Sequence, residues 1–153
     1  MPDLALKVPP VAQFVIIVLA MYAVSRMSIA LHFSLAGSTW FAIIFAAIGL
    51  GLGAMGVAEF KKAQTTVNPQ APEKVSAFVT SGVYQYTRNP MYLGLTIILC
   101  GWGLYLSSLL VFGLIVVFIL YMSRFQIQAE EQVMAQKFGS PYQDYLIQVR
   151  RWI

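Results

Sequence analysis

The stretch "TRNPMYLG" (residues 87–94) stands at the start of an apolar run that continues to Leu106. It places an arginine, an amide, a proline and a tyrosine within five residues. Proline disfavours helix at the residue before it, but it is well accommodated at the first position of a helix. The stretch therefore predicts that a helix begins at Pro90, with polar groups gathered at the mouth of an apolar segment.

The composition of the chain is that of a membrane protein. Of its 153 residues, 59% are hydrophobic and 10% are charged, and the mean hydropathy is +0.72. Soluble domains carry about 25% charged residues. We therefore expect an all-α integral membrane protein with a single domain over residues 1–153. The net charge of +4 is interpreted as the charge of cytoplasmic loops, not as a nucleic-acid-binding surface.

Four apolar segments predict about four transmembrane helices. They cover residues 11–27, 40–57, 92–106 and 108–122. A bilayer core about 30 Å thick takes about 20 helical residues, which fits the first two segments. The last two share about thirty residues, with Ser107 and Ser108 between them, and so predict a tight helical hairpin. Residues 1–60 would hold two N-terminal spans, and residues 61–153 a loop, the hairpin and a C-terminal helix.

The distribution of lysine and arginine predicts the orientation in the membrane. These residues gather in the loop 61–91 and again after residue 123, whereas the link 28–39 contains none. Cytoplasmic loops of membrane proteins are enriched in Lys and Arg. Both termini and the 61–91 loop are therefore expected in the cytoplasm.

The segment "SRFQIQAEEQVMAQKFG" (residues 123–139) predicts that the fourth span continues as a cytoplasmic amphipathic helix. It is rich in helix formers and ends at Gly139, with Pro141 two residues beyond, which is a typical stop signal. In a regular helix Gln126 and Glu130 share one face, while Arg124, Gln128 and Glu131 share a neighbouring one. Glu130 and Glu131 have two interpretations, a solvated helix surface or a carboxylate that accepts hydrogen bonds from a ribose or an amine.

Two other features favour packing over chemistry. "GLGAMG" (residues 51–56) matches a dinucleotide-binding pattern, but it lies inside an apolar helix without the strand that this pattern requires. Gly49 and Gly53 are spaced for close helix packing in lipid, within the chain or between copies in a homo-oligomer. The chain has one histidine, His32, and one cysteine, Cys100, so neither a metal site nor a Cys–His nucleophile is predicted.

Three features follow one another in the second half of the chain: the stretch "TSGVYQYTRNPMYLG", an apolar hairpin and the stretch "AEEQVMAQKFGSPYQDY". This order resembles the isoprenylcysteine carboxyl methyltransferase family and the related phospholipid methyltransferases. The resemblance covers about residues 65–152. It implies an S-adenosylmethionine site at the cytoplasmic edge of the membrane, formed by the loop, the hairpin and the C-terminal helix. The residues it assigns to the cofactor are Ser76, Ala77, Phe78, Val79, Tyr84, Asn89, Pro90, Met91, Tyr92 and Glu130. An arginine on the substrate side of the family's site falls on Gln126 here, with Arg124 half a turn earlier as its substitute.

This chain departs from the family pattern at a second position, because the usual Arg-His-Pro is Arg88-Asn89-Pro90 here. Asparagine replaces one histidine hydrogen bond but cannot be protonated. Methyl transfer to a carboxylate or thiolate needs alignment and exclusion of water more than it needs a base. The predicted function is that of an S-adenosylmethionine-dependent methyltransferase. Its acceptor would be lipidic or small and reached from the bilayer, with a carboxylate, a thiol or an amine as the reacting group.

Two alternatives remain at this point, one of them another enzyme and the other a protein of a different class. An NADPH-dependent membrane reductase of the sterol-reductase type would share the C-terminal features, although the chain offers few cations for a 2′-phosphate. The other is a non-catalytic small membrane protein, for example a transporter subunit or an assembly factor. Its signature would be charges inside the spans, and here only Arg26 lies near the end of one.

Overall fold

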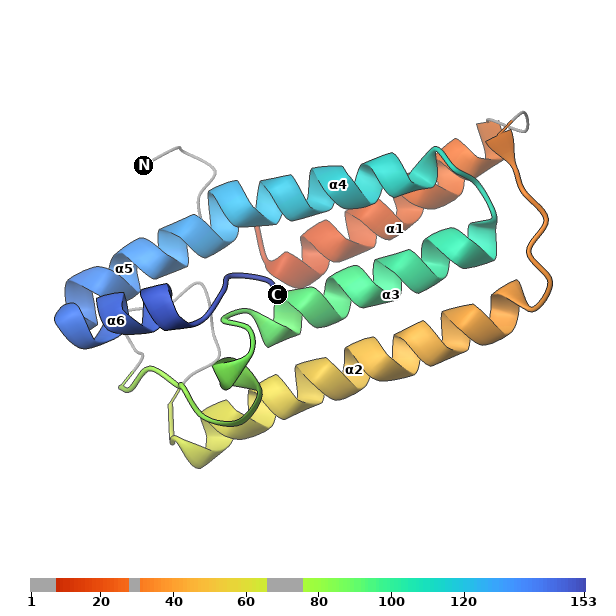
Figure 1. The fold of residues 1–153 in the computed structure, drawn as a ribbon. Helices are drawn as coiled ribbons and strands as arrows, with labels where there is room; N and C mark the ends of the chain where they lie inside the picture. Colours follow the sequence, from red (N-terminus) through yellow and green to blue (C-terminus); the bar gives the residue numbers. More distant parts are fainter. Residues whose placement is uncertain (1–7, 28–30, 66–75) are drawn as a thin grey trace.

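The computed structural model describes residues 8–27, 31–65 and 76–153, which form helices joined by turns. The elements are α1 (Pro10–Met27), α2 (Ser38–Lys62), the 3₁₀ turn η3 (Gly82–Gln85), α3 (Pro90–Leu106), α4 (Val111–Tyr121), the π-helical segment η4 (Met122–Ile127), α5 (Gln128–Phe138) and α6 (Ser140–Gln148). Figure 1 shows the long helices side by side, with α5, α6 and the C-terminus gathered at one end of the bundle. We call this end, where α2 finishes and α3 begins, the loop end.

The helices confirm an all-α integral membrane protein. Three of them are long and apolar enough to cross a membrane, namely α1, α2 and the continuous helix Val111–Phe138, and α3 is a shorter apolar helix. As predicted, α3 begins at Pro90. The second helix runs five residues past the predicted Val57, to Lys62, because Ala, Glu, Phe and Lys at its end contain no helix breaker. Two prolines of the 61–91 loop, Pro69 and Pro72, lie outside the described residues.

Helices α2 and α3 are antiparallel and approach each other closely through glycine. A Cβ atom added to Gly49 would collide with the carbonyl oxygen of Gly94, and one added to Gly94 would collide with that of Gly49. Small residues allow such contact between backbones in a membrane. "GLGAMG" lies inside α2, and its last glycine, Gly56, faces Pro90 and Met91. Pairing between copies through Gly49 and Gly53 stays a prediction.

The predicted hairpin is confirmed, and its turn is tied to the link between the first two helices. Ser107 adopts φ 51 and ends α3. Its carbonyl accepts a 2.9 Å hydrogen bond from the Phe33 N–H, and the Leu109 N–H donates a 3.0 Å bond to Leu31. The core lies beyond this turn, between α1, α3 and α4, and its largest buried side chains include Met21, Leu99, Phe118 and Met122.

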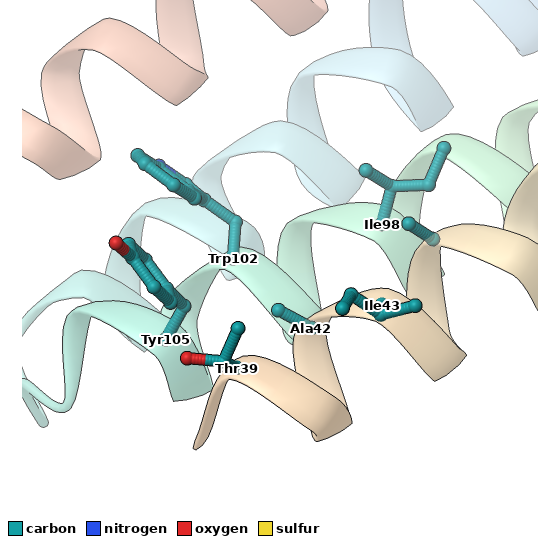
Figure 2. Close-up of a pocket in the computed structure, with 7 residues that line it drawn as sticks. Thr39, Ala42, Ile43, Ile98, Trp102 and Tyr105 are labelled. Atoms are coloured by element: carbon teal, nitrogen blue, oxygen red, sulfur yellow. The ribbon is translucent and has the colours of Figure 1, made fainter. Parts of the chain in front are cut away.

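An apolar groove of about 300 Å³ lies between α2 and α3 at the end opposite the loop end. Figure 2 shows Trp102 and Tyr105 on one wall and Thr39, Ala42 and Ile43 on the other. The two aromatic rings stack with centroids 5.3 Å apart. The groove is lined by apolar side chains and is separate from the polar residues of the loop end.

The chain reverses direction at Gly139, where the sequence predicts the end of the long helix. α5 ends at Phe138, and Gly139 has φ 62, a left-handed conformation that favours glycine. A further helix, α6, then begins with Pro141 in its first turn. Its buried tyrosines, Tyr142 and Tyr145, pack at the loop end, together with the end of α2 and the start of α3.

Candidate functional site

A hydrogen-bonded cluster of Tyr92, Gln126 and Glu130 lies at the loop end. The Tyr92 hydroxyl donates a 2.6 Å hydrogen bond to Oε1 of Glu130, and Nε2 of Gln126 donates a 2.5 Å bond to the same oxygen. Tyr92 is 8% exposed and Gln126 is 1% exposed. Both donors use Oε1, and within the described part of the chain no donor reaches the second oxygen, Oε2. The cluster therefore fixes a carboxylate and leaves one of its oxygens available to a ligand.

The π-helical segment η4 places Gln126 in this cluster. It interrupts the continuous helix between α4 and α5 over Met122–Ile127. A π turn inserts an extra residue and rotates the residues on either side relative to each other, and such turns are frequent at functional sites. Arg124 of the same segment lies on the exposed side and donates a 2.6 Å hydrogen bond to Gln128. The two predicted acceptor-side residues thus point in different directions.

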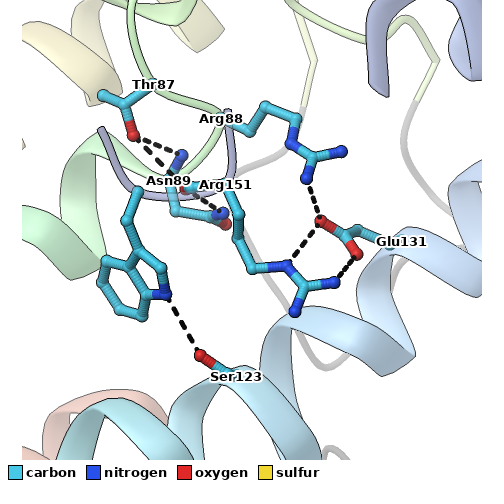
Figure 3. A network of polar contacts seen from close by, with 7 residues as sticks. Thr87, Arg88, Asn89, Ser123, Glu131 and Arg151 are labelled. Carbon is cyan, nitrogen blue, oxygen red and sulfur yellow. Dashed lines mark hydrogen bonds and ion pairs between the residues drawn. The ribbon is translucent and has the colours of Figure 1, made fainter. Parts of the chain in front are cut away.

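The turn before α3 is bound by the end of the chain. Nδ2 of Asn89 donates a 2.9 Å hydrogen bond to the carbonyl oxygen of Arg151, and the Arg88 N–H donates a 3.1 Å bond to that of Arg150. Figure 3 shows Thr87, Asn89 and Arg151 together. The polar group that replaces the family histidine therefore faces the C-terminal backbone.

Glu131 bridges the same two segments by ion pairs. Its Oε2 lies 2.5 Å from Nη2 of Arg151, and its Oε1 lies 3.3 Å from Nη2 of Arg88. The side chain of Glu131 is 14% exposed and that of Arg88 is 12% exposed. Hydrogen-bonded charge pairs of this kind fix geometry well when they are sheltered from water.

An aromatic wall joins the loop to the corner between α5 and α6. The ring of Phe78 packs edge-on against Phe138 and Tyr142, with centroids 5.1 Å and 5.5 Å apart. Val79 beside it is buried. Earlier in the loop, the Ser76 N–H donates a 3.0 Å hydrogen bond to Oγ1 of Thr65, which lies just after the end of α2. The Ala77 N–H donates a longer hydrogen bond of 3.5 Å to the same oxygen.

The segment Ser81–Tyr84 is held on both sides. Its Ser81 hydroxyl donates a 2.6 Å hydrogen bond to Glu59 of α2, and the Tyr145 hydroxyl donates a 2.8 Å bond to the Tyr84 carbonyl. Burial raises the pKa of Tyr145 to about 12, so this hydroxyl stays a donor at neutral pH. The Tyr84 hydroxyl itself is buried beside Gly56, and no described residue bonds to it.

The structure thus brings most of the sequence-predicted site residues to one end of the bundle. Tyr92, Gln126 and Glu130 touch directly, and Pro90 and Met91 pack on Gly56. Arg124 is exposed and apart from the cluster. Neither the ion pairs of Glu131 with Arg88 and Arg151 nor the bond between Glu59 and Ser81 was predicted from the sequence. A signal was present in the adjacent acidic residues 130–131 and the two arginines at the C-terminus, but no spacing rule connects them.

Comparison with known proteins assigns this arrangement to a family. The family model described as phospholipid methyltransferase matches residues 37–141. The chain belongs to the phospholipid methyltransferase family. The match covers α2, the loop, the hairpin and α5, and it ends before Tyr142 and the C-terminal arginines. Membership of this family confirms the predicted resemblance and makes the protein a membrane methyltransferase.

A relative from Haemophilus influenzae, described as an uncharacterized protein, is 43% identical over 63 residues. These residues are 41% of this chain and 100% of the relative. No solved structure matches the chain.

Proposed function

We propose that this membrane methyltransferase uses S-adenosylmethionine and binds it at the loop end, around Tyr92, Gln126 and Glu130. The observation that carries the proposal is the cluster itself, because it unites the "TRNPMYLG" and "AEEQ" stretches on one half-buried carboxylate. The acceptor would be a lipidic or small molecule that enters from the bilayer. The loop end would face the cytoplasm, because Lys61, Lys62 and the C-terminal arginines lie at this end and such charges gather on the cytoplasmic side.

The chemical groups at the loop end fit this cofactor. The ribose hydroxyls and the ammonium group of S-adenosylmethionine are hydrogen-bond donors, and Oε2 of Glu130 is an acceptor with no donor among the described residues. The buried hydroxyl of Tyr84 also has no partner there. The wall formed by Phe78, Phe138 and Tyr142 offers ring faces and edges to a purine. When bound, the cofactor supplies a methyl group on a positively charged sulfur.

The residues of the chain would act mainly by alignment. The bonds from Tyr92 and Gln126 hold the Glu130 carboxylate in one orientation, so that a bound donor is fixed relative to the acceptor. Burial of Tyr92 and Gln126 excludes water from this side of the site. Gln126 would meet the acceptor inside the site and Arg124 would meet its polar head at the exposed surface, in line with the acceptor-side roles predicted from the sequence.

The nature of the acceptor decides whether a base is needed. A carboxylate or thiolate attacks without one, whereas an amine must first lose a proton. Neither carboxylate is free for this role once the donor is bound, because Glu131 is already paired with two arginines and Oε2 of Glu130 would hold the donor. An amine acceptor would therefore have to enter the site in its neutral form. The family to which the chain belongs makes an amine-bearing lipid one of the acceptors to test first.

Transfer of a labelled methyl group tests this function. The purified protein is placed in lipid vesicles with S-[methyl-³H]adenosylmethionine and one of three acceptors: a total phospholipid extract, a prenylated thiol acid or a small thiol. We expect label in one acceptor class. Tyr92→Phe should transfer at least about tenfold less label, since a loss of about 1.4 kcal/mol of transition-state stabilisation lowers the rate tenfold. Folded wild-type protein that labels none of the three would contradict the proposal.

A further inference from the structure

The last residues of the chain bind the turn that precedes α3. The carbonyl oxygens of Arg150 and Arg151 accept hydrogen bonds of 3.1 Å from the Arg88 N–H and 2.9 Å from Nδ2 of Asn89. The Thr87 hydroxyl adds a longer bond of 3.4 Å to the Arg151 carbonyl. The turn is therefore held by the backbone of residues 150–151.

Arg151 and Trp152 also bind the continuous helix that carries Glu130. The guanidinium of Arg151 contacts both oxygens of Glu131, through Nε at 3.2 Å and Nη2 at 2.5 Å. Nε1 of Trp152 donates a 3.1 Å hydrogen bond to Oγ of Ser123 in the π-helical segment. A two-point contact between guanidinium and carboxylate fixes direction as well as distance.

We propose that residues 150–152 form a clasp and that Arg151 is a positioning residue for the donor site. Asn89 lies three residues before Tyr92, and Glu131 is adjacent to Glu130, so the clasp holds both partners of the 2.6 Å bond between Tyr92 and Glu130. Arg151 reaches the donor through these neighbours and not by direct contact. The inference rests on the proposed function, but it adds a part of the chain that lies beyond the family match, which ends at residue 141.

The clasp also gives a reason why asparagine suffices at position 89. Its partner is a backbone carbonyl oxygen, which needs a neutral N–H donor and not a positive charge. An amide supplies that donor at every pH.

Titration with S-adenosylhomocysteine in detergent, with the melting temperature measured alongside, tests the clasp. The variants are Arg151→Ala, Arg151→Lys and the matched control Arg150→Ala. Both alanine variants lose one arginine, but residue 150 contributes only its backbone carbonyl to the clasp, which Arg150→Ala keeps. The Arg150 side chain is exposed and makes no bond within the described structure. We expect Arg151→Ala to raise Kd at least about tenfold, because the two sides of the site are then no longer held together and must be ordered when the ligand binds. Arg151→Lys should recover part of the loss, and Arg150→Ala should match the wild type.

The outcomes separate this inference from the proposed function. A wild-type protein that is folded and does not bind S-adenosylhomocysteine would remove the proposed function itself. Equal Kd values for wild type, Arg151→Ala and Arg150→Ala, even with a lower melting temperature for Arg151→Ala, would overturn the clasp alone. If Arg151→Ala does not fold, Trp152→Phe replaces it, since it keeps an aromatic side chain but removes the donor to Ser123. An unchanged Kd in Trp152→Phe would then overturn the clasp.

Discussion

Tyr92 and Glu130, 38 residues apart in the chain, share a hydrogen bond of 2.6 Å at the start of α3 and α5. This bond is the direct link between the two stretches that suggested the family from the sequence. Tyr92 is buried. Loss of its hydroxyl would therefore remove a donor to the Glu130 carboxylate that water cannot easily replace.

A double-mutant cycle measures this link. Tyr92→Phe and Glu130→Gln should each change the free energy of unfolding by about 1–3 kcal/mol. Together they should deviate from additivity by about 0.5–3 kcal/mol, since the two side chains are in contact. Equilibrium unfolding in detergent gives the values. Tyr105→Phe, at the far end of α3, should be additive with Glu130→Gln, and strict additivity for Tyr92 as well would mean that the bond contributes nothing.

The contact between Gly49 and Gly94 should make α2 sensitive to a single methyl group. Gly49→Ala places a Cβ against the Gly94 carbonyl and the Ile98 side chain, and we expect a loss of about 1–3 kcal/mol in unfolding free energy from overpacking. Gly51→Ala is the matched control, because nothing lies within 4 Å of the added atom. It should be neutral or stabilising by up to about 1 kcal/mol, as alanine favours helix. Similar melting temperatures for the two variants would contradict the close approach.

The Tyr145 hydroxyl should stabilise the protein in a pH-dependent way. Burial raises its pKa to about 12 in the folded state, against about 10 in an unfolded chain. Its contribution is therefore fully present below about pH 10 and is lost as the pH rises through about 12. Tyr145→Phe should lower stability by about 1 kcal/mol at pH 8, and its difference from the wild type should shrink as the pH rises from about 10 to about 12. A constant difference over this range would rule out the raised pKa.

The orientation in the membrane can be read by chemical labelling. On a Cys100→Ala background, Lys61→Cys should react with an impermeant maleimide only in inverted vesicles, because the loop end is expected in the cytoplasm. Ala36→Cys, in the exposed part of the link between α1 and α2, should react only in intact cells. The reverse pattern would place the site on the other side of the membrane.

Much of the fold follows from local signals in the sequence. The hairpin turn at Ser107, the start of α3 at Pro90 and the end of α5 at Gly139 all lie where turn and capping chemistry predicts them. The pair Arg124 and Gln128 also forms as the helical spacing indicates. These features depend on residues close together in the chain, which is why the sequence alone predicts them.

The rest of the site depends on contacts that no local pattern encodes. Regular spacing placed Glu131 on the face of Arg124, but the π-helical segment lies within this stretch and Glu131 meets Arg88 and Arg151 instead. The C-terminal arginines were interpreted only as cytoplasmic charges, and the bond from Asn89 to Arg151 spans 62 residues. Tertiary packing decides such contacts, so they are seen in the folded structure and not in the sequence.

Calorimetric titration with S-adenosylhomocysteine tests the central claim most directly. Wild-type protein, Glu130→Gln and the control Gln132→Ala, an exposed residue of the same helix, are compared in detergent. The account predicts saturable binding with about one site in the wild type and in Gln132→Ala. In Glu130→Gln it predicts a Kd about ten- to a hundredfold higher, because hydrogen bonds to a charged group are worth about 1.5–3 kcal/mol. Binding that is equally tight in all three proteins would contradict the account by placing the donor away from Glu130.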